Sequence, residues 1–324
     1  MNLRRQFFGN KNKNNLFFYN VKNILSYPIP DSFFRMSLTK ELDKIKNYNP
    51  EIILKRVNYY NKLFEKTNLN TSKLYIKDFN LKNKEMLSPS THFFDTYQYI
   101  RYFSKDLPLA IKFGDNTDIP DWPSIVKSRP IASNNQNAVL LKLNKLRHFV
   151  FIKDKIPFEK KKDMLISRCS VYQPHRIKFF QMYFKHHLCD LGQTSARSII
   201  QKEWLKPYMT INQHLNYKFI LCLQGNDVAT NLKWVMSSNS LAVMPKPTFE
   251  TWFMEGTLIP DYHYVEINHD YSDLSAKLQY YISNPDKANM IIENANKYVI
   301  QFQDNQVEKL ISLQVLKKYF DLIL

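Results

Sequence analysis

The chain has 324 residues, of which 44% are hydrophobic and 15% aromatic, and it carries a formal net charge of +17. This composition excludes a disordered chain, and the length suggests two domains. The positive charge indicates a polyanionic partner, either a nucleic acid, an anionic membrane face or a phosphorylated substrate. A basic surface that is merely solvated is the alternative.

The three cysteines, Cys169, Cys189 and Cys222, lie far apart and lack the spacing of a metal site. No apolar run approaches the roughly 18 residues that a membrane-spanning helix needs. Because the chain also shows no signal-peptide pattern, we expect a cytoplasmic protein that its charge holds on a membrane surface.

The N-terminal third predicts mainly helices. Residues 1–35 are basic and aromatic, which fits either docking on anionic lipid or an arm packed on the fold. Residues 39–66 predict helix with a break near residue 50. Apolar residues in the second part recur at helical spacing and predict a buried face: Ile53, Val57, Tyr60 and Phe64.

A carboxylate-rich loop follows the first predicted strand. Residues 109–113 predict that strand. The loop after it is bounded by proline and carries Asp115, Asp118 and Asp121. The carboxyl end of a strand is where open α/β sheets place ligand chemistry, although a turn with helix-capping aspartates is the simpler interpretation. Further strands are predicted within residues 124–129, 138–143 and 147–152.

Two arginines bracket the next loop. Residues 164–166 predict a strand that leads to Arg168 and Arg176, before a helix over residues 177–188. Two guanidinium groups at a strand end can clamp a diphosphate, because each pairs bidentately with phosphate oxygens. An ordinary surface role for both arginines is the alternative.

A glycine turn occupies the centre of the C-terminal half. Residues 219–223 predict a buried strand that ends at Gly225, and Asn226 and Asp227 are favourable N-cap residues for a helix to residue 237. Helix N-termini bind anions, and Lys233 would lie within reach of a phosphate. The spacing is neither a Walker loop nor G-x-G-x-x-G, so an ordinary βαβ unit is the alternative.

The remaining elements complete an alternating pattern. We expect strands over residues 241–244 and 263–267, a short aromatic helix over 249–255, and helices over 274–282, 284–302 and 306–323. Alternation from residue 164 onward predicts a parallel α/β domain.

Three segments, in this order and spacing, resemble glycosyltransferase family 90. Residues 113–122 are similar to the family's V-R-D-Y-P-x-V-P-K-W segment, and residues 167–176 to its F-R-G-S-R-T-S-P-E-R segment. Residues 218–233 are similar to K-Y-L-x-N-x-x-G-x-x-x-S-x-R-x-K. Residues 238–242 and 252–264 extend the likeness, which is greatest to the bacterial lipopolysaccharide branch.

The resemblance implies a fold and a reaction. The fold is of GT-B type, with two Rossmann-like domains facing across a cleft. We divide the chain into an acceptor-side domain over residues 1–155, a nucleotide-sugar-binding domain over 156–305, and a helix over 306–324 that packs back on the first domain. The reaction is an inverting, metal-independent transfer from a UDP-sugar, consistent with the lack of a D-x-D triplet.

The resemblance also assigns residues. Asp115 aligns with the catalytic base, and we expect burial to raise its pKa. Asp118, Asp121 and Trp122 are acceptor candidates. The donor-binding candidates are Arg168, Ser170, Arg176, Gly225, Asn226, Asp227, Val228, Ala229, Thr230 and Lys233, with either Glu250 or Glu255 holding the ribose.

The chain departs from the family at a charged position. Asn231 replaces an arginine, so the charge of the leaving group would fall to Arg176, Lys233 and the helix dipole. A fold without activity is therefore one alternative.

The function that these observations predict is transfer of a hexose from UDP-glucose or UDP-galactose to a lipopolysaccharide-core hydroxyl, at the anionic inner face of the inner membrane. We expect no metal, cofactor or nucleic acid. The alternatives are a capsule or protein acceptor, or a basic nucleic-acid-binding protein.

Overall fold

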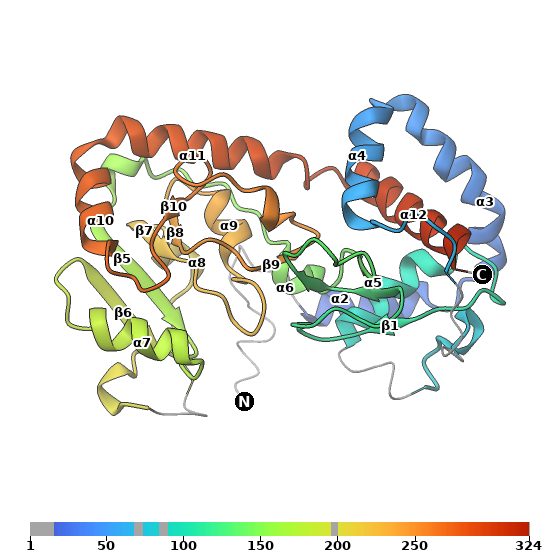
Figure 1. Ribbon diagram of the computed structural model, residues 1–324, viewed down its shortest axis with the longest axis horizontal. Coiled ribbons are helices and arrows are strands. Elements are labelled where there is room, and N and C mark those ends of the chain that lie inside the picture. Colours follow the sequence, from blue (N-terminus) through green and yellow to red (C-terminus); the bar gives the residue numbers. More distant parts are fainter. Residues whose placement is uncertain (1–15, 68–73, 84–89, 196–199, 324) are drawn as a thin grey trace.

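The computed structural model describes residues 16–67, 74–83, 90–195 and 200–323. Within these residues the chain forms a three-stranded parallel sheet, a five-stranded parallel sheet and a two-stranded antiparallel pair. Figure 1 shows the two parallel sheets side by side, with helices packed around each of them. The predicted α/β class is confirmed.

The N-terminal part consists of helices and the smaller sheet. Its helices are α2 (Leu16–Ser26), α3 (Asp31–Asp43), α4 (Pro50–Tyr60) and α5 (Ser90–Ile100). The side chain of Asn49 caps α4 by accepting hydrogen bonds from two backbone amides, and Pro50 occupies the first helical position. Ile53, Val57 and Tyr60 are buried as predicted, whereas Phe64 lies beyond the helix and is 77% exposed.

The smaller sheet has the order β1-β2-β4 and is parallel. Its strands are short: β1 (Ile111–Lys112), β2 (Ser124–Val126) and β4 (Ala138–Leu140). The strand predicted over residues 147–152 is wrong, because α6 (Lys145–His148) is a single helical turn and irregular chain follows it.

The larger sheet has the order β10-β8-β7-β5-β6, and every pairing is parallel, as the alternating pattern predicted. Its strands are β5 (Lys162–Cys169), β6 (Cys189–Gln193), β7 (Tyr217–Leu221), β8 (Leu241–Met244) and β10 (Val265–Glu266). Consecutive side chains of a strand point to opposite faces, so an apolar run such as β7 is buried on both sides.

Helices cover both faces of this sheet. On one face, Leu165, Phe219 and Val243 share a core with α7 (Pro174–Tyr183), α10 (Leu274–Ser283) and the start of α11 (Pro285–Ile300). On the other face, their neighbours Ile166 and Ile220 pack with α9 (Leu232–Met236), in a core that continues into the N-terminal part.

The antiparallel pair connects the two parts of the chain. It joins β3 (Ser128–Pro130) to β9 (Phe249–Thr251), where an aromatic helix was predicted. The helix prediction is wrong because these residues pair with a strand that lies far away in the sequence. Beside the pair, the rings of Tyr60 and Trp252 stack with their centroids 3.8 Å apart.

Helix α12 (Asn305–Leu322) returns to the N-terminal part, where it packs against α3, α4 and α5 (Figure 1). Near its start, Glu308 accepts hydrogen bonds from Arg56, Lys142 and the Trp252 indole. The division into domains at residues 155 and 305 stays a prediction.

Short 3₁₀ helices complete the described fold: Lys44–Asn47, Ile76–Asp78, Phe158–Lys160, Lys202–Trp204 and Glu255–Thr257. A single turn of α-helix, α8 (Ile211–His214), precedes β7. Within the described ranges, no helix combines the length and the apolar character that crossing a membrane requires.

Candidate active site

A cavity of about 520 Å³ lies at the carboxyl ends of β5 and β7, where they meet the loop after β1 and helix α6. Nine of the residues predicted from the sequence line it: Asp115, Arg168, Ser170, Arg176, Gly225, Asn226, Asp227, Val228 and Thr230. The three resembling segments therefore meet at one place, with Asp115 from residues 113–122 on one wall and the other two segments opposite.

Asp115 stands at a turn after β1. Gly114 precedes it with φ +107°, a backbone conformation that strongly favours glycine. The Asp115 carboxylate is about one-third exposed, accepts a hydrogen bond from the Asn226 side chain at 3.3 Å, and forms an ion pair with Lys127. It thereby faces the glycine turn across the cavity.

The pKa of Asp115 is lowered, which corrects the expectation of a raised value. Partial burial by itself raises this pKa, but the hydrogen bond and the positive charge of Lys127 outweigh it, with a further contribution from Arg147. Asp115 is therefore ionised at neutral pH, as a base must be before it accepts a proton.

Lys127 connects the two walls of the cavity. It is the single residue between β2 and β3, and it is only 2% exposed. Its ammonium group contacts both Asp115 and the Asp227 carboxylate, the latter at 2.7 Å. One buried cation thus holds a carboxylate from each of two segments that resemble the family, residues 113–122 and 218–233.

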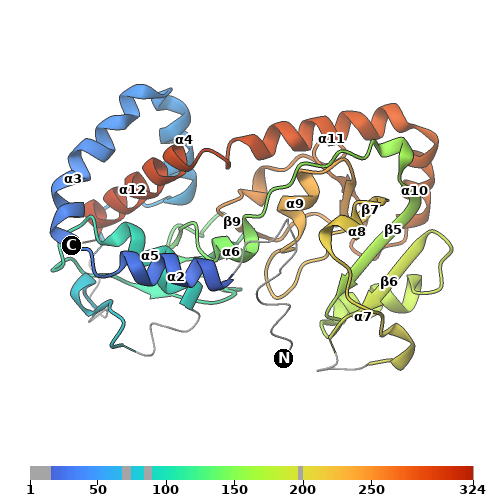
Figure 2. The same cartoon turned by 180° about the vertical axis from the view of Figure 1, so that it is seen from behind.

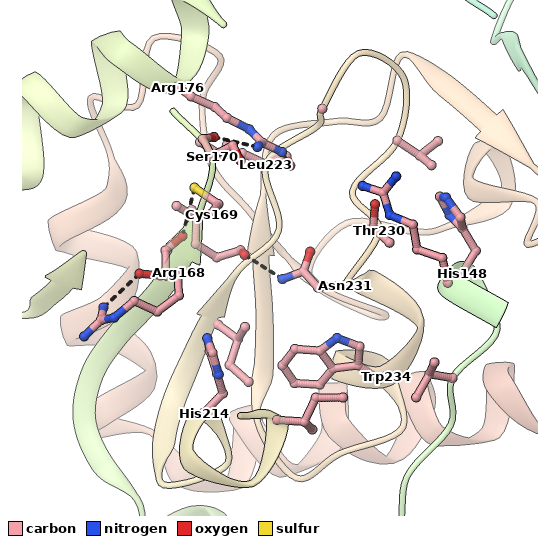
Figure 3. Close-up of a pocket in the computed structure, with 18 of the residues that line it drawn as sticks. His148, Arg168, Cys169, Ser170, Arg176, His214, Leu223, Thr230, Asn231 and Trp234 are labelled. Carbon is pink, nitrogen blue, oxygen red and sulfur yellow. Dashed lines mark hydrogen bonds between the residues drawn. The ribbon is translucent and has the colours of Figure 1, made fainter. Parts of the chain in front are cut away.

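The two arginines have different surroundings (Figure 3). Arg168 points away from Arg176 and pairs with Asp190 at 2.8 Å, so its charge is compensated between β5 and β6. Arg176 donates to three backbone carbonyls, those of Ser170, Leu223 and Gln224, at 2.8–2.9 Å. Among the described residues no carboxylate pairs with Arg176, so it presents an uncompensated positive charge to the cavity.

The glycine turn is followed by a loop, which corrects the helix predicted from Asn226. Helix α9 begins only at Leu232, because the would-be capping side chains contact other segments. Asn226 bonds to Asp115 and Tyr172, and Asp227 pairs with Lys127. A helix N-terminus therefore does not follow Gly225 directly, and the phosphate site that we expected in this loop stays a prediction.

Four predicted donor residues do not line this cavity: Ala229, Lys233, Glu250 and Glu255. Lys233 is fully buried, and its ammonium group pairs with Glu255 instead of reaching toward a phosphate. Glu255 also accepts from the Thr251 amide and hydroxyl. Glu250 is bound by Arg129 at 2.7 Å and by the Tyr59 hydroxyl.

A second cavity, of about 250 Å³, lies on the other side of the glycine turn. Val228 lines both cavities, whereas Ala229 and Glu255 line only the second. Of the two glutamates predicted to hold a ribose, Glu255 borders the second cavity, whereas Glu250 lines neither of these two cavities. Asn231 lines the first cavity, and its side chain donates to the Leu221 carbonyl at 2.9 Å.

The acceptor candidates lie outside both cavities. Asp118 is exposed and pairs with Lys112, while Asp121 and Trp122 are also exposed. Asp115 is therefore the carboxylate of this loop that reaches the cavity.

The sequence interpretation missed three residues of the site: Lys127, Arg147 and His148. Arg147 is exposed on α6 and, among the described residues, makes no hydrogen bond or ion pair, although it lines the cavity. His148 is buried beside it, and burial, together with the charges of Lys233 and Lys127, holds the pKa of His148 well below its ordinary value. No motif marks these residues. Because a strand was predicted over residues 147–152, the helical turn that carries Arg147 and His148 was not expected.

Within the described ranges, no group of three or more His, Cys, Asp or Glu side chains is placed to hold a metal ion. This observation does not test the prediction that the reaction needs no metal ion.

Comparison with known proteins identifies the class. The profile of glycosyl transferase family 90 matches residues 158–323, about half of the chain. The chain belongs to this family and is a glycosyltransferase. It is also 40% identical over 298 residues to O-glucosyltransferase LpsA from Dichelobacter nodosus, an alignment that covers 91% of this chain and 92% of that protein.

Proposed function

We propose that the chain is an inverting O-glucosyltransferase that uses UDP-glucose as donor and a hydroxyl of the lipopolysaccharide core as acceptor. The name of the Dichelobacter nodosus relative supports the sugar, and the likeness to the lipopolysaccharide branch supports the acceptor. The observation that carries the proposal is one cavity lined both by an ionised, accessible Asp115 and by Arg176, which has no carboxylate partner among the residues that the structure describes.

In the proposed reaction, Asp115 is the general base. It takes the proton of the acceptor hydroxyl while that oxygen forms a bond to the anomeric carbon of glucose. The bond from that carbon to UDP breaks on the opposite face, so the configuration inverts and UDP leaves with the bonding electrons. Because the lowered pKa makes Asp115 a weak base, correct positioning of the hydroxyl supplies much of the rate enhancement.

The leaving diphosphate needs positive charge and hydrogen-bond donors. Arg176 provides a fixed guanidinium at one wall, and Arg147 provides another from α6. Arg176 keeps the role that we gave it from the sequence, and Arg147 takes the place of Lys233, whose charge Glu255 neutralises. Asn231 stands where the family has an arginine, and in this proposal Arg147, from the N-terminal part of the chain, supplies the positive charge that is missing there.

In this proposal the two parallel sheets are the two lobes of a GT-B fold, with the donor on the larger sheet and the acceptor on the smaller one. The enzyme works at the inner face of the inner membrane, where its net charge of +17 attracts anionic lipid and a phosphorylated acceptor.

The direct test is UDP release with a panel of UDP-sugars and a truncated lipo-oligosaccharide acceptor, with and without EDTA. We expect turnover with UDP-glucose that EDTA does not change. Turnover only with UDP-galactose would overturn the donor assignment, and loss of turnover in EDTA would overturn the metal-independent mechanism.

A further inference from the structure

We propose that His148 is a specificity-determining residue that hydrogen-bonds a hydroxyl of the transferred hexose, an inference that rests on the proposed function. His148 lines the first cavity and is 2% exposed. Neither of its ring nitrogens has a hydrogen-bond partner among the residues that the structure describes. Burying a polar atom without a partner costs free energy, so a ligand group that pairs with the ring recovers that cost on binding.

His148 differs in this respect from the other buried polar side chains that line the cavity. Ser167, Gln173, His214 and Asp227 each make a hydrogen bond or an ion pair within the described part of the chain. The ring nitrogens of His148 are shielded from solvent in this arrangement. The ring therefore turns toward the cavity when the hydroxyl enters.

Helix α6 places His148 where the hexose must lie, between Asp115 and the leaving diphosphate. Arg147, the preceding residue, also lines the cavity, and its charge contributes to the lowered pKa of Asp115. Figures 1 and 2 both show α6 in the middle of the molecule, where the parts around the two parallel sheets meet. In Figure 3, His148 comes from α6 on the opposite side of the cavity from Arg168. His148 therefore follows directly a cation that we assign to the diphosphate, in the same N-terminal part of the chain as the base.

The surrounding charges favour a hydroxyl over a phosphate as the partner of His148. Its charged and titratable neighbours come from four places in the fold: Lys233 of α9, Lys127 between β2 and β3, Arg147 of α6 and His92 of α5. Burial and the three positive charges hold the pKa of His148 well below its ordinary value, so the ring is neutral at neutral pH. A neutral imidazole has one donor and one acceptor, and it matches a hydroxyl, which also has both.

The test measures kcat/KM with UDP-glucose and with its four deoxy analogues, each lacking one hydroxyl of the glucose, for the unaltered chain and for His148→Leu. We expect the variant to lose at least about tenfold with UDP-glucose. The unaltered chain should lose a similar factor with the one analogue that lacks the contacted hydroxyl, and with that analogue the variant should lose nothing further. The Kd for UDP, which has no hexose, should be the same for both.

His92→Leu is the matched control. His92 is also 2% exposed, and neither of its ring nitrogens has a partner among the described residues, but it does not line the cavity. Its donor profile should equal that of the unaltered chain. Because both variants remove a buried polar group that has no partner, the thermal midpoint should be unchanged or higher in each of them. A residue that only packs the fold would lose stability and would not distinguish between the analogues.

Three outcomes would overturn the inference: equal losses by His148→Leu with UDP-glucose and with every analogue, a weaker affinity of this variant for UDP, or the same altered donor profile in His92→Leu. If the unaltered chain transfers glucose and His148→Leu does so equally well, the inference alone fails. If galactose is the sugar transferred, the same series is made on UDP-galactose. If the unaltered chain transfers no hexose from any UDP-sugar, the proposed function fails and this inference fails with it.

Discussion

At the scale of single residues, the partners of a charged side chain decide its role. Arg168 and Arg176 lie eight residues apart and both line the cavity, yet within the described part of the chain only Arg168 has a carboxylate partner. The hydrogen bonds from Lys206, Tyr217 and Arg168 lower the pKa of Asp190 to about 2, although its partial burial alone would raise it. Asp190 of the sheet therefore neutralises the charge of Arg168, whereas the charge of Arg176 is available to a ligand.

The first prediction concerns donor affinity. Arg176→Met should raise the Kd for UDP by about tenfold to a hundredfold, since a charge-assisted hydrogen bond contributes about 1.5–3 kcal/mol. Arg168→Met should leave this Kd nearly unchanged and lower stability instead, because Asp190 loses a partner. Titration calorimetry and thermal unfolding of both variants check this. Equal losses of UDP affinity would contradict the assignment.

The second prediction concerns pH. Lys127 lowers the pKa of Asp115, so Lys127→Met should raise that pKa and move the acid limb of kcat/KM to higher pH. Because the folded-state pKa is depressed, the stability that this carboxylate contributes is present above its unfolded pKa. That stability is lost as pH falls through the folded value.

Lys112→Met is the matched control for this experiment, because Lys112 pairs with Asp118 of the same loop outside the cavity. Its pH profile should equal that of the unaltered enzyme, and circular dichroism should show both variants folded. An acid limb that does not move in Lys127→Met would show that Asp115 does not control the rate.

At the scale of elements, strands could be predicted where both faces of the larger sheet are apolar, as in β5, β7 and β8. The sequence did not reveal β6, because Asp190 lies in the middle of the strand. Its carboxylate is accommodated there by Arg168, Lys206 and the Tyr217 hydroxyl, three partners that only the folded chain assembles.

Glycine also has an element-level role in the antiparallel pair. A Cβ atom at Gly256 would lie 2.7 Å from a carboxylate oxygen of Glu250 and 2.9 Å from the Tyr59 hydroxyl. A side chain at this turn after β9 would therefore displace Glu250 or Tyr59, whereas glycine leaves Glu250 in place to pair with Arg129 of β3.

The third prediction concerns this pair. Arg129 is fully buried and bonds to Glu250 and to the Tyr60 and Ala138 carbonyls. Arg129→Met should lower the free energy of unfolding by about 3–5 kcal/mol, because it leaves a buried carboxylate unpaired. Adding Glu250→Gln should recover part of this loss. Urea unfolding measures both.

An exposed ion pair gives the control for the stability prediction. Lys297 and Glu293 lie one turn apart on α11 and are both solvated, so Lys297→Met should leave the unfolding midpoint unchanged. A small effect of Arg129→Met, equal to that of this control, would contradict the structural role of the buried pair.

At the scale of the whole molecule, the site depends on contacts between distant segments. The resemblance identified Asp115, Ser170, Arg176 and the glycine turn, because their motifs are local in sequence. It could not identify Lys127 or Arg147, since a lone basic residue has no motif and its position follows from packing of the two sheets. The same packing explains why a loop follows Gly225 where a helix was predicted, since Asp227 pairs with Lys127 from the other part of the chain.

The measurement that tests the account most directly is steady-state turnover of Asp115→Asn, with Asp118→Asn as the matched control from the same loop. Asp115→Asn should lower kcat by about 10²–10⁴-fold while UDP affinity is retained, because the base is lost and the donor contacts remain. Asp118→Asn should be as active as the unaltered enzyme. Full activity of Asp115→Asn, or an equal loss in Asp118→Asn, would contradict the assignment of Asp115 as the base.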